Sequence, residues 1–200
     1  ALTRIILAST SSARKQILEK SGLIFDVMAP MVDEDAIKES LQAEGLGPRN
    51  IADALAEAKA VKLSVKHPAA LVIGADQMLA LDEGPLFDKP GSPEIARAQL
   101  TQMAGKSHQL FSAVVIAQSG EPLWRHVGTV RMHVRPLSPA FIDSYVARNW
   151  DSIRHCVGCY QIEAEGAQLF TRIEGDYFDI LGLPLLPLLA YLRERKEMPS

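Results

Sequence analysis

The sequence predicts an α/β protein built on a mixed, substantially antiparallel β-sheet with flanking helices. Short apolar segments alternate with stretches of helical periodicity in the first half of the chain, as in other α/β folds. Two longer segments, 109–118 and 122–135, have strand patterning and flank a Ser119-Gly120 turn, which predicts a hairpin. Because hairpins pair antiparallel and helical crossovers allow parallel pairing, we expect both pairings in one sheet.

Turn and capping residues mark the elements of the N-terminal part. A cluster of hydroxyl side chains follows the first apolar segment and offers N-caps to a helix that a glycine then ends. A second apolar segment leads into a polar region in which glycine and proline predict a break. In order, we expect a strand over 4–8, a helix over 13–20, a strand over 23–30, an acidic loop over 31–36 and a break at Gly45, Gly47 and Pro48.

A long helix is predicted from Asn50, as its N-cap, to about Lys66. At 100° per residue, Ile51, Leu55, Ala58 and Val65 cluster on one side. Lys59 lies about 40° from Leu55 on this wheel and so borders the buried side. The position suits a cation that serves a cleft, but also an ordinary surface lysine whose stem covers apolar groups.

The remaining elements follow from the same signals. Proline and glycine bound an amphipathic segment after a turn-rich stretch, and polar and apolar residues alternate through Val130, Met132 and Val134. In order, we expect a strand from Leu71, a helix over 93–103, the hairpin strands, a helix over 139–149, short strands through Ile173 and Ile180, and a terminal helix to about Lys196.

Composition places the chain among ordinary globular proteins. It has 200 residues, 48% of them hydrophobic, with a net charge of −3, so we expect a single domain over 1–200 with two lobes. The charge argues against binding a nucleic-acid polymer or an anionic membrane. Apolar stretches are too short to span a bilayer, and the first residues lack the features of a signal peptide, so the expected location is the cytoplasm.

The loop "ASTSSARK" is a candidate phosphate-binding site. Four hydroxyl groups, a helix N-terminus and two cations lie within one turn of each other. Backbone N–H groups at a helix start favour an anion, and an arginine can contact it through two donors. The residues concerned are Ser9, Ser11, Arg14 and Lys15. The sequence is not a P-loop, and a well-capped helix with solvated charges is the alternative reading.

Three further charged residues join this loop and Lys59 as candidates. Asp76 interrupts the apolar run "LVIGADQML", Glu34 lies in "VDEDA", and Lys89 lies in "DKPG". Taken singly, each has an ordinary reading as a cap, a solvated charge or a turn residue. Together with Lys59 and the loop cations, they suit metal-assisted cleavage of a phosphoanhydride, in which carboxylates hold a hard cation and lysines neutralise phosphate oxygens.

The cysteines form a single C-x-x-C unit, Cys156 and Cys159. Such a unit occurs in redox motifs, and it also supplies two of the four ligands in many zinc sites, where His155 would be a further ligand. No second pair exists in the chain. Residues 160–166 read as strand and loop, whereas a redox motif normally opens a helix, so we expect reduced, structural thiols.

The order of these motifs resembles the Maf (septum-formation-inhibitor-like) family of nucleoside triphosphate pyrophosphatases. The resemblance covers nearly the whole chain and rests on six ordered blocks: "LASTSSARKQIL", "VDE", "AEAKA", "VIGADQ", "DKPGSPEIARAQLTQMAGKSHQLFSAVVI" and "RIEGDYFDILGLPL". It implies an elongated α/β fold with a cleft between two lobes. It also implies hydrolysis of a nucleoside triphosphate between the α and β phosphates with a divalent cation, Mg²⁺ or Mn²⁺.

The resemblance assigns roles by motif position. Asp76 becomes the proton acceptor that activates water, and Glu34 joins it around the metal. Lys59 and Lys89 would contact the phosphates, and the loop from Ser9 to Lys15 would hold the triphosphate end. The alternative is a regulatory protein of septum formation that senses nucleotides without turning them over, and a homodimer is expected only on general grounds.

Three positions bear on the choice of base. Gln77 and Glu163 are similar to the branch of the family that acts on 7-methyl-GTP, and a carboxylate at 163 could accept two hydrogen bonds from guanine and offset the charge of a methylated ring. That branch carries an aromatic residue where this chain has Ala13, so a stacking surface is missing. The resemblance thus points to 7-methyl-GTP at two of these positions and away from it at the third.

Overall fold

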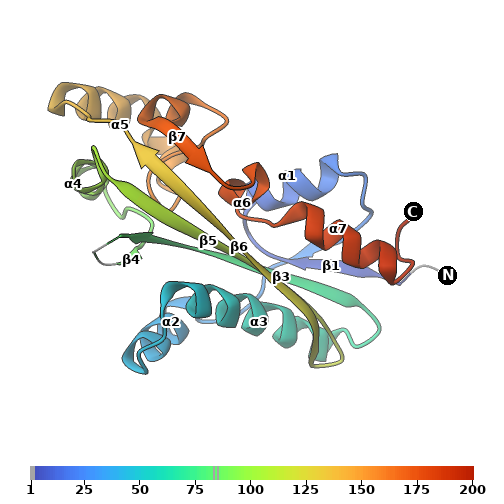
Figure 1. Cartoon of the computed structure of the whole chain (residues 1–200). Coiled ribbons are helices and arrows are strands. Elements are labelled where there is room, and N and C mark those ends of the chain that lie inside the picture. Colours follow the sequence, from blue (N-terminus) through green and yellow to red (C-terminus); the bar gives the residue numbers. More distant parts are fainter. Residues whose placement is uncertain (1–2, 83, 85) are drawn as a thin grey trace. The chain divides into compact units, whose positions relative to one another are not determined.

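The computed structural model describes residues 3–82, 84 and 86–200 and confirms the α/β class. The described residues form a seven-stranded sheet in the order β2-β1-β3-β5-β6-β7, with β4 paired to β3 (Figure 1). β1 pairs parallel with β2 and β3, whereas the β3–β4 and β6–β7 pairs are antiparallel, so the sheet is mixed. The strands are β1 (Ile5–Ala8), β2 (Asp26–Met28), β3 (Leu71–Leu81), β4 (Leu86–Phe87), β5 (Ser107–Gln118), β6 (Glu121–Val134) and β7 (Phe170–Glu174).

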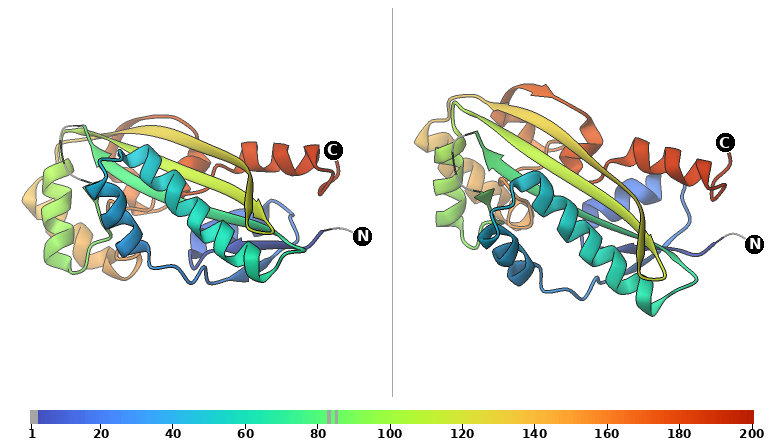
Figure 2. Two further views of the ribbon diagram at one scale, coloured as in Figure 1. Left: turned by 90° about the horizontal axis from the view of Figure 1, so that it is seen from below. Right: turned by 60° about the horizontal axis from the view of Figure 1, so that its bottom comes forward.

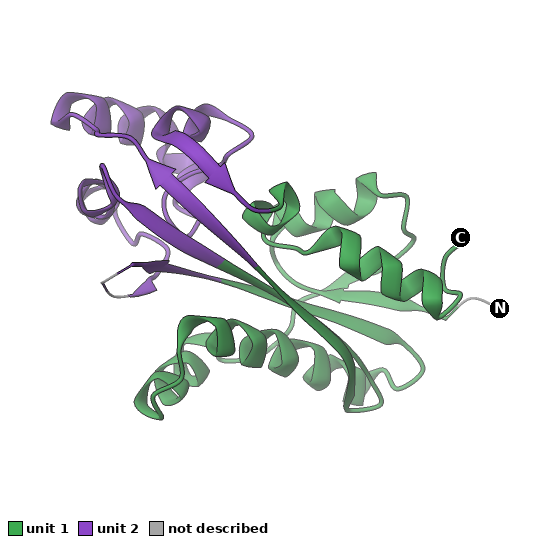
Figure 3. Cartoon of the chain, viewed as in Figure 1, with its two compact units in different colours: residues 1–77, 111–128, 176–200 green, residues 78–110, 129–175 purple. Residues whose placement is uncertain are grey.

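The chain divides into two compact units (Figure 3). Unit 1 takes in residues 1–77, 111–128 and 176–200, and unit 2 takes in 78–110 and 129–175. Helices α1 (Ser12–Lys20), α2 (Glu34–Ala43), α3 (Pro48–Lys66), α6 (Tyr177–Leu181) and α7 (Leu185–Glu194) belong to unit 1, and α4 (Pro93–Met103) and α5 (Pro139–Ile153) belong to unit 2.

Helices cover both faces of the strands in unit 1 (Figure 2). On one face, Leu7 and Ile73 pack in a buried cluster with Leu18 of α1 and Leu188 of α7. On the other face lies α3. Burial on both faces explains why the first ten residues of β3 are almost all apolar or small and why they are nearly all buried.

Alternate residues of strand β3 face the cluster with α1 and α7 on one side and helix α3 on the other. Leu71, Ile73 and Ala75 join the cluster with α1 and α7. Gly74 faces α3 instead, since a Cβ atom built on it would lie 2.2 Å from the Ala56 carbonyl oxygen and 2.7 Å from the Ala60 nitrogen. Side chains alternate along a strand, so Asp76 shares the α3 side with Gly74. Gly74 therefore lets α3 approach the strand closely, and the strand continues through it instead of bending there.

We expect Gly74→Ala to destabilise the protein by about 3 kcal/mol, because the added methyl group would overlap backbone atoms of α3 that cannot move independently. Urea unfolding of purified protein measures this loss. Gly91→Ala is the control, since the nearest atom to its added Cβ would be the Ile95 side chain at 3.8 Å. Equal stability of the two variants would show that α3 shifts without cost.

Unit 2 is organised around two packed helices. α4 packs against α5, and the buried residues include Leu100 and Met103 from α4 and Ile142 and Val146 from α5. A short 3₁₀ helix, η1 (Glu165–Leu169), leads into β7. α4 begins at Pro93, whose ring suits the first helical position, and Ser92 caps it by accepting a hydrogen bond from the Ile95 nitrogen at 3.2 Å.

Several predicted elements are confirmed. The helix over 93–103 has the predicted bounds, and β5 and β6 form the predicted hairpin strands. Both turn residues between them, Ser119 and Gly120, have positive φ, which suits a tight hairpin turn. Val130, Met132 and Val134 are buried as the alternation predicted.

The break predicted at Gly45, Gly47 and Pro48 is confirmed, since it separates α2 from α3, but two other predictions for residues 31–50 were wrong. The expected acidic loop is the start of helix α2, and Asp33 caps it by accepting a hydrogen bond from the Ala36 nitrogen at 3.0 Å. α2 has only two large apolar residues, Ile37 and Leu41, at helical spacing, and both are half-buried, so its periodic apolar signal is short and easily missed. α3 begins at Pro48 with Gly47 as its N-cap, two residues before the predicted cap Asn50.

Four other boundaries differ. Ile180 lies in helix α6 and not in a strand, and residues 160–166 form turns leading into η1. β2 has only three residues, whereas α5 runs on to Ile153. Short helices such as α6 depend on contacts with the rest of the chain more than on propensity, so their sequence signal is weak. No described helix is long and apolar enough to cross a membrane.

Candidate functional site

Lys59 is a buried cation at the middle of the inner face of α3. Only 4% of it is exposed, and its neighbours on the helix, Leu55, Ala56 and Leu63, are also buried. The buried face is centred roughly 100° from Ile51 on the helical wheel, so Lys59 lies near its middle and not at its border. The reading as a surface lysine is wrong, and Val65, predicted on the buried side, is 64% exposed.

Two carboxylates share the Lys59 ammonium group. Lys59 Nζ lies 2.7 Å from Glu34 Oε1 and 3.0 Å from Asp76 Oδ1, and it also donates to the Ala75 carbonyl oxygen at 3.0 Å. Glu34 comes from the first turn of α2, Lys59 from α3 and Asp76 from β3. Unit 1 therefore brings together three of the four residues predicted to carry the chemistry.

Asp76 is the more buried of the two carboxylates. Its residue is 7% exposed, and its second carboxylate oxygen, Oδ2, is buried without a hydrogen-bond partner among the residues that the structure describes. Burial raises the pKa of Asp76, while Lys59 and Arg14 act in the opposite direction. A buried, incompletely satisfied carboxylate is costly to keep in a core unless a ligand completes its contacts.

Arg14 brings a second positive charge to these carboxylates. Burial lowers the pKa of its guanidinium group, and the charges of Asp76 and Glu34 partly oppose that shift. Its Nε donates to the Gly182 carbonyl oxygen at 2.7 Å. The Ser11 hydroxyl caps α1 by accepting from the Arg14 backbone nitrogen at 3.3 Å, so this loop is both a well-capped helix start and a source of a cation.

The other predicted loop residues differ in their surroundings. Ser9 is 5% exposed, and its hydroxyl accepts from the Ser11 nitrogen at 3.0 Å, so it shapes the turn before α1. Lys15 is exposed and lies 3.8 Å from Glu19 on the same helix. Ala13 is half-buried in the first turn. Lys15 thus pairs with a carboxylate on its own helix and not with Glu34 or Asp76.

Gln77 belongs to the face of β3 opposite Asp76. Its side-chain nitrogen lies 3.1 Å from the Ser112 hydroxyl oxygen and 3.0 Å from the carbonyl oxygens of both Asp179 and Ile180. These contacts hold its amide against α6 within unit 1. They favour a structural use of this amide nitrogen over the base contact expected from the sequence.

Asp179 is a second buried carboxylate in unit 1. It sits against β6 at Gly128, where a Cβ atom would lie 2.1 Å from Asp179 Oδ2. Burial, with a smaller effect from Asp176, raises the pKa of Asp179 to about 6. Gly128 thus leaves the space that this carboxyl group occupies.

This raised pKa makes folding dependent on pH. Asp179 holds its proton in the folded state up to about 6, but its ordinary pKa is 3.8. Its contribution to stability is therefore fully present below pH 3.8 and is lost as pH rises through about 6. We expect Asp179→Asn to remove this pH dependence. The gain in free energy of unfolding over wild type should be larger at pH 8 than at pH 4, by up to about 3 kcal/mol. Urea unfolding at both pH values, with the exposed Asp151→Asn as control, measures it; parallel pH profiles for wild type and Asp179→Asn would contradict it.

Lys89 and Glu163 lie in unit 2, both exposed. Both charges act on the pKa of the Cys156 thiol. Burial raises this pKa to about 11, the charge of Glu163 raises it further and the charge of Lys89 opposes the shift. The two predicted residues are therefore neighbours of one thiol within the same unit. Each remains a candidate on the grounds given by the sequence.

The two cysteines are free thiols. Cys159 is fully buried, its Sγ lies 3.2 Å from Gln99 Oε1, and burial raises its pKa to about 12. Thiols with raised pKa values are poor nucleophiles and poor metal ligands at neutral pH. These properties favour the predicted structural role, and they weigh against the redox or zinc module.

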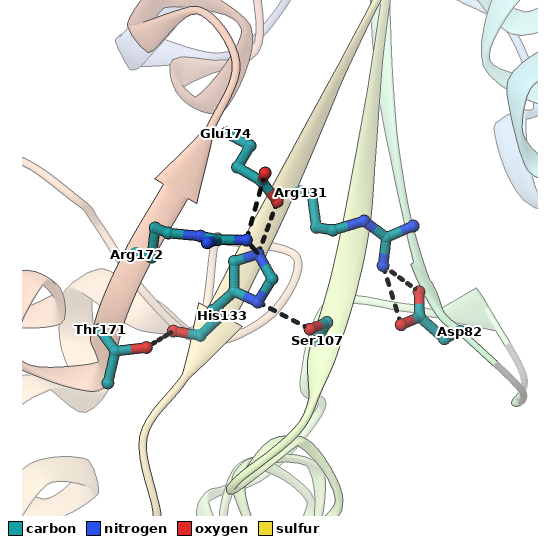
Figure 4. A network of polar contacts seen from close by, with 7 residues as sticks. All are labelled: Asp82, Ser107, Arg131, His133, Thr171, Arg172 and Glu174. Atoms are coloured by element: carbon teal, nitrogen blue, oxygen red, sulfur yellow. Dashed lines mark hydrogen bonds and ion pairs between the residues drawn. The ribbon is translucent and has the colours of Figure 1, made fainter.

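A separate set of polar contacts within unit 2 involves β5, β6, β7 and the turn that follows β3 (Figure 4). The His133 ring lies 2.9 Å from the Ser107 hydroxyl and 2.7 Å from Glu174 Oε2, while Arg131 contacts both carboxylate oxygens of Asp82 at 2.8 Å. Hydrogen bonds from His133 and, to a smaller extent, Arg172 lower the pKa of Glu174. Opposite charges pair with one another here, and the network includes none of the predicted site residues.

The fold and the charged group together define an α/β protein with a buried lysine between two carboxylates and an arginine at a helix start. Sequence comparison then identifies the family: the model described as Maf-like protein matches residues 4–195, and the chain belongs to this family. The match spans both compact units.

Close relatives carry one name. The chain is 56% identical to a protein of Sphingopyxis alaskensis over 98% of its own length and 99% of the relative's. It is 54% identical to one from Ruegeria pomeroyi and 55% identical to one from Caulobacter vibrioides, each over 96% of both chains. All three relatives are named nucleoside triphosphate pyrophosphatase.

Sequence reasoning missed the groups that hold the site together. The Ala75 and Gly182 carbonyl oxygens bind Lys59 and Arg14, and the Ser112 hydroxyl contacts Gln77. Backbone carbonyls carry no residue-specific signal. Ser112 did offer one, because a hydroxyl in the apolar run "FSAVVIA" needs a buried hydrogen-bond partner.

Proposed function

We propose that the protein hydrolyses nucleoside triphosphates between the α and β phosphates, giving a nucleoside monophosphate and pyrophosphate. The observation that carries this proposal is the buried Lys59 ammonium group held between Glu34 and Asp76, with Arg14 acting on the same carboxylates. Such a mixed group can bind phosphate oxygens and accept a proton from water. The shared name of the close relatives supports the same activity.

In this proposal Asp76 accepts the proton of the attacking water. Its raised pKa makes it a stronger base than an exposed aspartate, and Lys59 fixes one of its oxygens at 3.0 Å. The other oxygen, Oδ2, has no hydrogen-bond partner among the described residues, and we propose that it receives the proton of a water bound with the substrate. General-base catalysis of this kind contributes about 10²–10⁴-fold to a rate.

The cations would hold the triphosphate. Arg14 can contact a phosphate through two parallel hydrogen bonds, and the backbone N–H groups at the start of α1 favour an anion. Lys59 would neutralise charge that builds up on phosphate oxygens, and Lys89 and Lys15 are proposed as further phosphate contacts. Ser9 and Ser11 shape the loop that presents Arg14.

The carboxylates also fit a divalent cation, Mg²⁺ or Mn²⁺. Asp76 and Glu34 supply the hard oxygen atoms that these ions prefer, and the unpartnered Asp76 Oδ2 is a ready ligand. In the described part of the chain, no group of three or more His, Cys, Asp or Glu side chains is arranged to hold a metal. When bound, such a cation would lower the pKa of water and shield phosphate charge.

For the base, we propose that Glu163 is the residue that selects guanine-type nucleotides, with 7-methyl-GTP as the candidate substrate. Glu163 is an exposed carboxylate, able to accept two hydrogen bonds and to offset a positive ring. Gln77 is a weaker candidate for this task, because three groups of unit 1 already contact its amide nitrogen.

Pyrophosphate release tests the proposal. Purified protein is incubated with GTP, UTP, dTTP and 7-methyl-GTP in the presence of Mg²⁺ or Mn²⁺, and pyrophosphate and monophosphate are quantified. We expect release of both products from at least one nucleotide. Binding without release from any of them would overturn the enzymatic proposal in favour of a nucleotide-sensing protein.

Glu163→Gln is expected to change the order of kcat/KM values among these nucleotides. The substitution keeps the shape of the side chain but removes the charge, so discrimination should shift by about 1–3 kcal/mol, and most for the methylated base. Glu44→Gln, on the exposed end of α2, is the control. An unchanged order would remove Glu163 from base recognition.

A further inference from the structure

We propose that Gln77 and Ser112 position Arg14 for the triphosphate by clamping helix α6. The inference rests on the proposed function and deepens it, since it assigns a part in substrate binding to residues that touch neither the substrate nor Arg14 directly. The residues involved are all in unit 1.

The clamp acts on the end of α6. The nitrogen of the Gln77 amide lies 3.0 Å from the carbonyl oxygens of both Asp179 and Ile180. The Ser112 hydroxyl, which is fully buried, donates to the same Asp179 oxygen and accepts from Gln77 at 3.1 Å. Carbonyl oxygens only accept hydrogen bonds, so these partners fix which end of the Gln77 amide faces the helix.

The clamped carbonyls belong to a helix of only five residues. The last carbonyls of any helix lack partners within it, and so short a helix has little stability of its own. Gln77 and Ser112 supply donors to those carbonyls from β3 and β5, which are buried strands. The place of α6 in unit 1 therefore depends on these two side chains.

Gly182 transmits this position to Arg14. It follows α6 directly in the left-handed conformation, with a φ of 104°, and its carbonyl oxygen accepts from Arg14 Nε at 2.7 Å. With Nε held, the plane of the guanidinium group is fixed, and the four N–H groups on its two Nη atoms are the ones suited to a bidentate phosphate contact.

Strand β3 positions both the proposed proton acceptor, Asp76, and, through Gln77 and α6, the cation Arg14. Asp76 and Gln77 are consecutive in β3 and project to opposite faces, so one residue holds the lysine side of the site while the next holds α6. A small displacement of α6 would move the Arg14 anchor while leaving the contact between Lys59 and Asp76 in place. The expected signature is weakened triphosphate binding with a lesser effect on the chemical step.

A double-mutant cycle tests this coupling. Gln77→Leu is expected to raise KM for the preferred nucleotide by about tenfold, and to weaken binding of inorganic triphosphate, measured calorimetrically, by about the same factor. In an Arg14→Ala background, Gln77→Leu should change either quantity by less than about twofold, because the group it positions is gone. Ser112→Ala, a gentler change, should follow the same pattern with a smaller effect.

Ser64→Ala is the matched control. Ser64 is also a fully buried hydroxyl in unit 1, but it donates to Val61 and accepts from Gly120, away from α6. It should leave KM and triphosphate affinity unchanged. If Gln77→Leu and Ser112→Ala had equal effects with and without Arg14, or changed KM according to the base and not the triphosphate, the positioning role would be wrong.

Triphosphate affinity separates this inference from the proposed function. If the wild-type protein binds inorganic triphosphate but releases pyrophosphate from no nucleotide, the proposed hydrolysis fails while the cycle still reports on the clamp. If nucleotides are hydrolysed but the cycle shows independent effects, the clamp fails and the hydrolysis stands. Wild-type protein that does not bind inorganic triphosphate would overturn the clamp, whereas pyrophosphate release alone decides the proposed hydrolysis.

Discussion

Asp76→Asn is expected to lower turnover of nucleoside triphosphates by about two to four orders of magnitude, the range that loss of a general base produces. Asparagine has nearly the same shape and can still accept a hydrogen bond from Lys59, which lies 3.0 Å from Asp76 Oδ1. It cannot take a proton from water, and it binds a divalent cation weakly. Single-turnover kinetics with saturating nucleotide measures the chemical step directly.

Asp151→Asn provides the surface control for this change, because Asp151 is exposed on α5. Thermal unfolding should show that Asp76→Asn is folded, because Lys59 keeps its 2.7 Å contact to Glu34 and burial already disfavours the charged form of Asp76. Turnover within a few-fold of wild type would remove Asp76 from the role of proton acceptor.

Lys59→Met is expected to destabilise the protein by about 3–5 kcal/mol, as breaking a buried ion pair does when one partner is removed. Methionine fills a similar volume but leaves Asp76 without the ammonium group that contacts it and removes the 2.7 Å contact to Glu34. Chemical denaturation at neutral pH measures the effect. Turnover should fall as well, since the same ammonium group is proposed to neutralise phosphate oxygens.

Lys66→Met is the matched control, because Lys66 is exposed in the last turn of the same helix. It should change stability by less than about 1 kcal/mol. Adding Asp76→Asn to Lys59→Met should recover part of the lost stability, because the uncompensated carboxylate is then gone. Equal unfolding midpoints for the two lysine variants would contradict the buried ion pair.

How far the sequence predicts the fold depends on how each element is buried. β6 alternates between buried and more exposed residues from Gly128 to Val134, and the helix over 93–103 has a proline start and a glycine end, so both were predicted. α2 buries no residue and β2 has only three, so neither offers a pattern long enough to recognise.

The candidate site follows the same logic. Arg14, Glu34 and Asp76 could be singled out because a charge beside an apolar strand or a helix start is unusual, but the place of Lys59 was misjudged. α3 buries alanines at 52, 56 and 60, where the helix packs closely on β3, whereas Ala58 is half-buried and Val65 is exposed. The wheel predicted from Ile51, Leu55, Ala58 and Val65 was therefore turned by roughly 100° from the observed buried face. The anchoring of Arg14 by Gly182 depends on a contact between residues 168 positions apart, which no local pattern encodes.

This long-range contact also has a consequence for biosynthesis. Arg14 is translated early and Gly182 much later, so a nascent or truncated chain that stops short of Gly182 can form α1 but cannot anchor its arginine. Domains that draw a site from distant segments gain it only when the later segment has emerged from the ribosome. The cell would therefore obtain the nucleotide-handling arrangement only from chains synthesised through that segment, and incomplete products would carry the capped helix without its fixed cation.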